Sequence, residues 1–352
     1  MKIIVDAMGG DNAPHAPVKG ALDAVREFPG IHVTLVGQGD AILSALEQEG
    51  VSEPPPEIEV VHASEVVEMC DNPATAFKEK KDSSLTVGLN LLKEGKGDAF
   101  VSAGSTGALL SAATLLVKRI KGIRRAAMCP VLPTKGKGMV LIDCGANAVC
   151  TPEYLLQFAF MGSYYAERAL GCPEPRVGLL NIGAEESKGT DLQRETYHLL
   201  KEAGAQGRIQ FVGNVEAREA MLGAVDVLVC DGYSGNVLLK TLEGTALYMA
   251  GMIKGMFKKN ALTKLAALMV SGGIKEFKKK LDFGEIGGTA LMGISKPVIK
   301  AHGSSDAYAL KNAIRQASQY ASSGIVEGIA ENIDYMRLPV TAKNAETTSE
   351  KE

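Results

Sequence analysis

Short apolar runs alternate with segments of helical periodicity along most of the chain. The first run, "KIIVD" at residues 2–6, leads into a glycine pair and then into a helical pattern. Five later segments repeat this plan: "AFVSAGSTGALL", "MVLIDCGANA", "VGLLNIGAEESKGTDL", "VDVLVCDGYSGNVLLK" and "VIKAHGSSDAYALKNAI". Continuous apolar strands that alternate with helices are typical of a parallel sheet covered on both faces. The pattern therefore predicts an α/β fold with three layers, α/β/α, around a mostly parallel sheet.

The chain shows no internal repeat and no long linker, so we expect one compact two-lobed unit over residues 1–340. The first lobe is predicted to hold about 1–145 and 285–335, with the last strand-loop-helix unit rejoining its sheet. The second lobe is predicted over about 146–284. It includes a protruding helical hairpin at about 243–283, broken near Ser271, Gly272 and Gly273. The tail 341–352 is polar and aperiodic, which predicts disorder.

Composition narrows the class of protein. A net charge of -3 argues against a nucleic-acid binder, because such binding requires excess lysine and arginine. Apolar stretches such as "ALLSAATLLV" end after about ten residues, whereas a membrane span needs roughly 20. The six cysteines form no C-x-x-C pair, and we expect no signal peptide ahead of Met1. We therefore expect reduced thiols in a cytoplasmic protein.

The glycine-rich corners are the predicted location of the chemistry. In sheets of this kind ligands lie beyond the carboxyl ends of the strands. Glycine lets main-chain N–H groups approach an anion closely, and a helix start presents unpaired N–H donors. The segment "SAGSTGALL" fits best, with Ser102, Gly104, Ser105 and Thr106 placed to surround an anion. Any single corner is explained as well by a capped turn, but six together favour a shared cleft for a phosphate-containing ligand.

Several familiar motifs are missing. The chain has no G-x-x-x-x-G-K-[ST], and no G-x-G-x-x-G follows the first strand. The segment "GYSGN" at 232–236 is not the G-x-S-x-G of a serine hydrolase. The five histidines lie far apart, without a metal-ligand spacing. We therefore predict no metal site and no cofactor.

Eight motifs in order closely resemble the bacterial phosphate acyltransferase family PlsX. They are "VDAMGGDNAP", "VSAGSTGALL", "KGIRRAAMCPVLPT", "DCGANA...PEYLLQFAFMGS", "GLLNIGAEESKGT", "GNVEAR", "DGYSGNVLLKTLEG" and "KAHGSSD". The resemblance implies transfer of a fatty acyl group from acyl carrier protein to inorganic phosphate, giving acyl-phosphate for phospholipid synthesis. It also implies a homodimer, a fold similar to isopropylmalate dehydrogenase and phosphotransacetylase, and a membrane glycerol-3-phosphate acyltransferase that uses the product. Ser105 and Val149 depart from the family pattern, which has asparagine and aspartate there.

Two other functions remain open at this stage. A phosphotransacetylase-like enzyme that uses coenzyme A shares the phosphate cleft but needs only a small acyl pocket. A non-catalytic membrane or lipid-enzyme scaffold is the third reading, and the intact polar corners argue against it.

Attack of phosphate on a thioester requires an anion-binding turn, donors for the oxyanion, and alignment of the reactants. We expect Ser102, Gly104, Ser105 and Thr106 to bind phosphate or the oxyanion. Lys188 and Lys240 are expected to add charge, and His302 or Asp231 serves as an optional base. The carboxylates Asp6 and Asp11 are acceptors only, so we expect them to hold loop N–H groups or orient a lysine. The remaining residues predicted to line the same opening are Gly9, Gly10, Asn147, Asn181, Glu185, Gly232 and Asn236.

Acyl carrier protein is acidic, so its docking calls for a basic surface. One candidate is the end of a helix, with Lys118, Arg119, Lys121, Arg124 and Arg125, where helix capping is the alternative explanation. The second is the hairpin, with Lys254, Lys258, Lys259 and further lysines among methionines and leucines. Such a lysine-rich amphipathic pair suits a dimer seam, a carrier-protein dock or an element that binds an anionic membrane surface.

Overall fold

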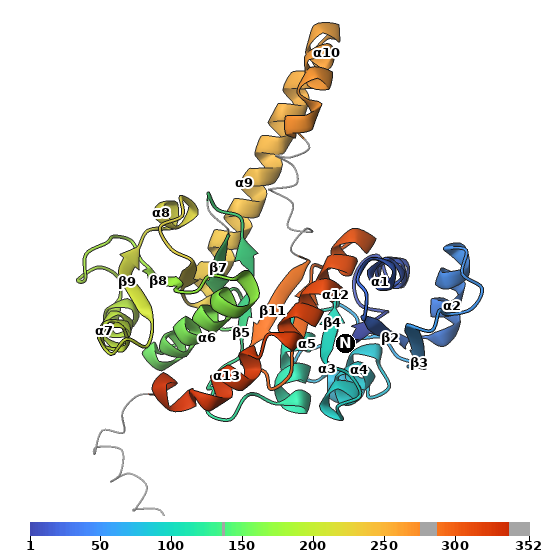
Figure 1. Ribbon diagram of the computed structural model, residues 1–352, viewed down its shortest axis with the longest axis horizontal. Helices are drawn as coiled ribbons and strands as arrows, with labels where there is room; N and C mark the ends of the chain where they lie inside the picture. The colour runs from blue at the N-terminus through green and yellow to red at the C-terminus, as the bar shows by residue number, and fades with distance from the viewer. Residues whose placement is uncertain (136–137, 275–286, 338–352) are drawn as a thin grey trace, which may run out of the picture.

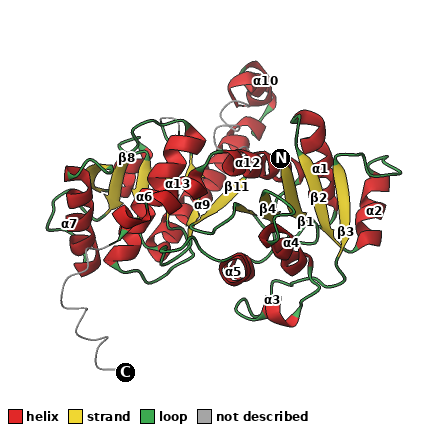
Figure 2. Ribbon diagram, turned by 60° about the horizontal axis from the view of Figure 1, so that its bottom comes forward, coloured by secondary structure: helices red, strands yellow, loops and turns green. Residues whose placement is uncertain are grey.

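The computed structural model describes residues 1–135, 138–274 and 287–337 and arranges the strands in two sheets (Figure 1, Figure 2). The first has the order β3 (Ile58–His62), β2 (His32–Gly37), β1 (Lys2–Asp6), β4 (Ala99–Ser102), β12 (Val298–Ala301), β11 (Gly288–Met292) and β5 (Ala127–Cys129). The second has the order β6 (Val131–Leu132), β7 (Met139–Ile142), β10 (Val227–Val229), β8 (Arg176–Leu180) and β9 (Gln210–Val215). Most neighbouring strands are parallel, which confirms the predicted α/β class.

Helices cover both faces of each sheet because successive strand residues point to opposite sides. Ile3 and Val5 pack in one apolar cluster with α1 (His15–Glu27), α2 (Gly39–Gln48) and α12 (Ala307–Ser322), whereas Ile4 packs in another with α4 (Ser84–Lys93) and α5 (Thr106–Ala112). In the second lobe, α6 (Pro152–Leu170) and α7 (Asp191–Ala205) lie opposite α8 (Ala217–Met221) and α9 (Gly232–Lys258). The short elements are α3 (Ala76–Glu79), η1 (Ala113–Val117), α13 (Ile325–Glu331) and η3 (Ile333–Met336). The first of these clusters runs through both lobes, so they share one core.

The chain crosses between the lobes at Pro130, earlier than the boundary near 145 expected from the sequence. β5 leads through Pro130 into β6, and β6 pairs antiparallel with β7. Further hydrogen bonds join Leu141 N–H to the Pro130 oxygen and Cys144 N–H to the Met128 oxygen. β7 therefore runs opposite to β5, which is itself aligned with β4 through β12 and β11. As a result the carboxyl ends of the parallel strands of the two lobes lie at opposite edges.

The hairpin projects from the second lobe, as Figure 1 shows for α9 and α10 (Ala261–Met269). Of the residues of α9, only Gly232 and Gly235 are buried. The helical segment is broken first at Lys259 and Asn260, where the side chains of Asn260 and Thr263 form a capping box, a break that the sequence did not predict. It is broken again at Val270, after which residues 271–274 are helical, so this second break lies beside the one predicted near 271–273. Residues 275–283 of the predicted hairpin and the predicted disordered tail 341–352 lie outside the described residues. In the described part, no helix combines the length and apolar character needed to cross a membrane.

Candidate active site

The turn after β1 and the turn after β4 are joined by a buried carboxylate. Asp6 is 3% exposed, and its Oδ2 accepts the Ser102 hydroxyl proton at 2.7 Å. The Ser102 oxygen in turn accepts the Gly104 N–H at 3.0 Å, and Asp6 Oδ1 accepts the Met8 N–H. The Ser102 proton is thus directed at Asp6, so Ser102 orders this turn. Burial raises the pKa of Asp6, while hydrogen bonds from Ser84 and Ser102 act in the opposite direction.

The glycine pair allows these two turns to touch. A Cβ atom on Gly9 would lie 2.5 Å from Asp6 Oδ2 and 2.7 Å from the Gly104 nitrogen. Gly10 has φ of +100°, which disfavours any side chain, and a Cβ there would lie 2.9 Å from the Gly303 oxygen. The exposed Asp11 follows, and its N–H donates to the same Gly303 oxygen at 2.8 Å. The turns after β1, β4 and β12 are therefore packed backbone to backbone.

A buried lysine lies under this junction. Lys300 is the third residue of β12, pairs in register with Ser102, and is 6% exposed. Its Nζ donates to the Ala103 oxygen at 3.2 Å and to the Ala301 oxygen. Burial lowers the pKa of Lys300 to about 8, although Asp6 and Asp11 act to raise it. We call Asp6, Ser102, Gly104 and Lys300 the first-lobe cluster.

The other residues predicted in this lobe lie at the edge of the first-lobe cluster. Ser105 caps α5 by accepting the Ala108 N–H at 3.5 Å, a role that asparagine also performs, so this departure from the family pattern preserves the cap. Thr106 is partly buried at the first position of α5. His302 is exposed, with Nδ1 2.9 Å from the Ser304 hydroxyl.

A second buried carboxylate organises the second lobe. Asp143 follows β7 and is fully buried; its Oδ1 accepts the N–H groups of Met128 at 2.8 Å and Cys144 at 2.7 Å. Its Oδ2 accepts the Asn147 N–H at 2.6 Å and the Asn147 amide at 3.0 Å. Burial raises the pKa of Asp143, against these N–H donors. Gly232 completes what we call the second-lobe cluster of Asp143, Asn147 and Gly232, because a Cβ on Gly232 would lie 2.7 Å from Asp143 Oδ2.

The start of α9 closes on this cluster. Asp231 caps the helix, with Oδ1 accepting the Ser234 N–H and Oδ2 accepting the Ser234 hydroxyl, both at 2.8 Å. Each carboxylate oxygen accepts one hydrogen bond from Ser234, so Asp231 orders the first turn of α9, and its role as a base stays a prediction. Asn236 is exposed beside Gly145. Val149 is 87% exposed in the loop before α6.

The remaining predicted residues form a separate corner after β8. Asn181 is buried and holds the loop through the Ile182 N–H at 2.8 Å and the Lys188 oxygen at 3.1 Å. Asn214 on β9 donates to the Glu185 oxygen at 2.9 Å. The side chains of Glu185 and Lys188 are exposed. Through the described residues, no hydrogen bond or ion pair links this corner to the first-lobe cluster. The reversal at β7 places the carboxyl ends of the parallel strands of the two lobes at opposite edges, and a single opening lined by all six corners stays a prediction.

Lys240 nevertheless connects the lobes. α9 runs back beside β7, where Leu238, Leu239 and Leu242 pack against the cluster of Leu132 and Met139. Lys240 acts electrostatically on both Cys144 of the second lobe and Lys300 of the first. It pairs with Glu243 at 2.8 Å and is 52% exposed in its side chain. The charge of Lys240, on an element of the second lobe, therefore acts on Lys300 of the first-lobe cluster.

The basic segment lies elsewhere. The helix that follows "SAGSTG" ends at Val117, so the five cations at 118–125 lie in the loop beyond it rather than in its last turn. All five are exposed; Arg124 pairs with Glu153 at 3.0 Å, and Arg125 lies 5.6 Å from the Tyr154 ring. This loop precedes β5, so it lies at the edge of the second-lobe cluster. It is at the opposite end of the strands from Lys300.

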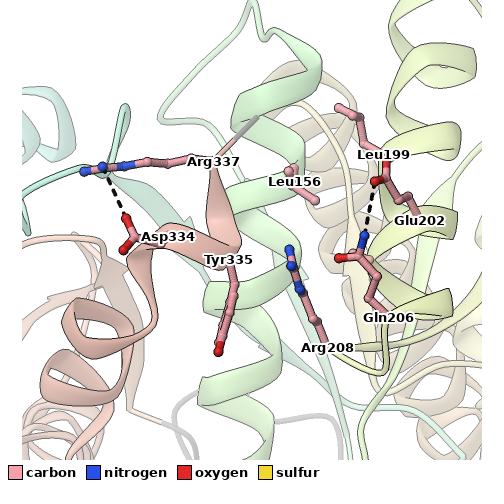
Figure 3. Close-up of a pocket in the computed structure, with 9 residues that line it drawn as sticks. Leu156, Leu199, Glu202, Gln206, Arg208, Asp334, Tyr335 and Arg337 are labelled. Carbon is pink, nitrogen blue, oxygen red and sulfur yellow. Dashed lines mark hydrogen bonds and ion pairs between the residues drawn. The ribbon is translucent and has the colours of Figure 1, made fainter. Parts of the chain in front are cut away.

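A cavity between α6, α7 and η3 is distinct from all of these corners (Figure 3). Its polar lining includes Arg208 over the Tyr335 ring at 4.8 Å and a Glu202–Gln206 hydrogen bond at 3.1 Å. None of its lining residues belongs to a glycine-rich corner.

Sequence reasoning missed Lys300 and Asp143, although both stand inside quoted motifs. Lys300 stands within the apolar run of "VIKAHG", and Asp143 directly follows the apolar run of "MVLIDCG". In both places a charged residue lies in or next to a buried strand. A charge is seldom fully buried unless it is paired or functional, so that position was the available signal.

Comparison with known proteins agrees with the motifs. A family model described as "Fatty acid synthesis protein" matches residues 1–327. A protein named phosphate acyltransferase from Alkaliphilus oremlandii is 48% identical over 95% of this chain and 97% of its own length. A protein of the same name from Clostridium acetobutylicum is 47% identical, over 95% of this chain and 99% of its own.

Solved structures support the fold. A phosphotransacetylase from Streptococcus pyogenes has a TM-score of 0.62 at 18% identity, covering 91% of this chain and 94% of its own. A 4-hydroxythreonine-4-phosphate dehydrogenase from Klebsiella pneumoniae has a TM-score of 0.54 at 13% identity, covering 91% and 98%. The predicted phosphotransacetylase-like fold is therefore confirmed. Together with the family match, the curated relatives confirm that this chain belongs to the phosphate acyltransferase family of fatty acid synthesis proteins and is an acyltransferase.

Proposed function

We propose that the enzyme transfers a long-chain fatty acyl group from acyl carrier protein to inorganic phosphate, giving acyl-phosphate for phospholipid biosynthesis. The observation that carries the proposal is the convergence of positive charge on the first-lobe cluster in a chain of net charge -3. Lys300 is buried there, and Lys240 approaches from the other lobe.

In this reaction a phosphate oxygen attacks the thioester carbonyl carbon. A C–O bond forms, the C–S bond breaks, and the carrier thiolate leaves and takes up a proton. Holding phosphate beside the carbonyl supplies most of the rate enhancement by proximity. Lys240 is placed to offset the negative charge of the tetrahedral intermediate. His302, exposed at the rim of the first-lobe cluster, is the proposed proton-transfer group, because both oxygens of Asp231 are engaged by Ser234.

The test is phosphate-dependent release of free carrier protein from palmitoyl-acyl carrier protein. We expect release with acyl-phosphate formation, slowed in His302→Ala through lost proton transfer and in Ser105→Ala through the lost cap of α5. Turnover of short acyl-coenzyme A without release from acyl carrier protein would refute the proposal and indicate a phosphotransacetylase-like enzyme. Absence of any phosphate-dependent turnover would leave the scaffold reading.

We further propose a homodimer that contacts an anionic membrane surface through the hairpin. The support is its exposed apolar set: Leu247, Tyr248, Met249, Met252, Met256, Leu262, Leu265, Leu268 and Met269. These side chains are uncovered in a single chain, and Lys254, Lys258, Lys259 and Lys264 lie among them. A second copy covers one apolar face, and the lysines contact anionic lipid. This arrangement brings acyl-phosphate close to a membrane glycerol-3-phosphate acyltransferase.

A further inference from the structure

We propose that the Lys300 ammonium group binds the inorganic phosphate substrate. This assignment rests on the function proposed above. It adds a phosphate-binding residue whose role neither Lys188 nor Lys240 takes over. Lys188 is exposed on its loop, and Lys240 is already paired with Glu243.

The burial of Lys300 is the first argument. Its carbonyl partners on Ala103 and Ala301 use two of the three N–H donors of the ammonium group. Within residues 1–135, 138–274 and 287–337, no carboxylate lies within the 4.0 Å of an ion pair with Lys300. A buried charge with no direct counter-ion is costly in free energy. An anionic ligand that accepts the third donor removes that cost.

The surroundings of Lys300 are the second argument. The charged groups that face it are Asp6 from β1, Asp11 from the turn after β1, and Lys240 from α9. Asp6 directs its Oδ2 to the Ser102 hydroxyl and does not neutralise Lys300 by contact. Phosphate placed at Lys300 therefore lies beside the turn at Ala103 and Gly104, where the charge of Lys240 also acts. Gly9 and Gly10 pack directly against this turn, because a Cβ atom on Gly9 would lie 2.7 Å from the Gly104 nitrogen and one on Gly10 would lie 2.8 Å from the Ala103 Cβ.

The protonation of Lys300 makes phosphate binding sensitive to pH. Because burial lowers the pKa of Lys300 to about 8, the free enzyme loses the ammonium form as pH rises through that value. Bound phosphate favours the charged form, so the contribution of Lys300 to the affinity is full below this pKa and is lost above it. The ratio kcat/KM for phosphate reports this free-enzyme pKa.

The experiment uses the full-length enzyme with Lys300→Met and, as a control, Lys96→Met. Lys96 is exposed, pairs only with Glu94 at 2.8 Å and precedes β4, at the opposite end of the strands. Loss of a charge-assisted hydrogen bond should raise the KM for phosphate about 10- to 100-fold in Lys300→Met. The KM for palmitoyl-acyl carrier protein should change by less than about twofold. A rise confined to the carrier-protein KM would overturn the assignment, because it would place the carrier's phosphodiester at Lys300 instead.

A second readout needs no turnover. Inorganic phosphate should raise the thermal unfolding midpoint of the wild type and of Lys96→Met, by mass action, but not that of Lys300→Met. Removing a buried charge should leave Lys300→Met folded and at least as stable as the wild type without phosphate. An equal phosphate shift in Lys300→Met overturns the proposal.

If Lys300→Met does not fold, the phosphate shift of the wild type is measured against pH, and a shift that does not fall above about 8 overturns the proposal. If the wild type binds phosphate through Lys300 but releases no carrier protein, the proposed function fails while the assignment of Lys300 stands.

Discussion

Replacing Asp143 with alanine should destabilise the enzyme more than almost any other single change in the second lobe. The carboxylate is fully buried and accepts N–H groups from Met128, Cys144 and Asn147 at 2.8, 2.7 and 2.6 Å. These donors come from β5, from the end of β7 and from the loop that supports Gly232 of α9. One side chain therefore holds the junction of the two lobes and the start of the hairpin.

The magnitude follows from the donors left without an acceptor. Each buried donor that loses its partner costs about 1–3 kcal/mol. A water molecule entering the space of the carboxylate satisfies part of the set. For three short backbone bonds we expect a loss of about 3–6 kcal/mol in the free energy of unfolding, against about 5–15 kcal/mol for a typical protein. Asp143→Asn keeps one acceptor oxygen but turns an NH2 group toward two donors, so we expect about 2–4 kcal/mol.

The assay is urea unfolding at neutral pH, followed by far-ultraviolet circular dichroism and by tyrosine fluorescence, because the chain has no tryptophan. Coincidence of the two probes tests whether one free energy describes the transition. Asp334→Ala, at an exposed carboxylate paired only with Arg337, is the control and should leave the midpoint unchanged. A loss below about 1 kcal/mol in Asp143→Ala would refute the reasoning, because the donors would then be satisfied by water as well as by the carboxylate.

Four further predictions follow from the same structure. Ser102→Ala removes the link between Asp6 and Gly104 and should lower kcat/KM for phosphate about 10-fold with little effect on the carrier-protein KM, as steady-state kinetics will show; an unchanged ratio would count against the first-lobe cluster. The exposed Cys70 should react first with a thiol reagent. Burial raises the pKa of Cys144 and Cys150 to about 12, so these two thiols should stay unreactive until the pH is raised or the fold opens. Peptide mass spectrometry that finds Cys144 modified first would contradict this order. A triple variant should no longer float with anionic vesicles at low salt if it carries Lys254→Glu, Lys258→Glu and Lys259→Glu. Retained flotation would exclude these lysines as the lipid contact. Arg119→Glu with Arg124→Glu should raise the KM for acyl carrier protein but not for phosphate if the basic loop is the dock, and the hairpin variant should do so if the dock lies there.

Much of the fold was predictable from sequence because it depends on local pattern. The six apolar runs ending beside glycine are strands of the two sheets, and the residues that alternate along "KIIVD" do pack against helices on opposite faces. The turn chemistry was equally local: Asp231, Ser105 and Asp306 each cap the helix that they begin. Eight ordered motifs were sufficient to recognise the family.

The site was less predictable because it depends on relations between distant strands. The spacing of residues gives each corner its loop and cap, but it does not give the direction of one set of strands relative to another. That direction was decided at Pro130, where β5 leads into β6 and β6 pairs antiparallel with β7. The reversal separates the corners at Asn147 and Asn181 from the corner at Ser102.

What the sequence by itself determined is the set of strands, helices, caps and glycine turns, because these depend on contacts within a few residues. What only the tertiary structure decided is which of them meet. Lys300 is an ordinary lysine in the sequence, and it becomes a buried ammonium group only when β12 pairs with β4 and the turns at Gly10 and Gly104 close over it. Its depressed pKa arises from that burial, since the cost of desolvating a charge depends on every segment packed around it.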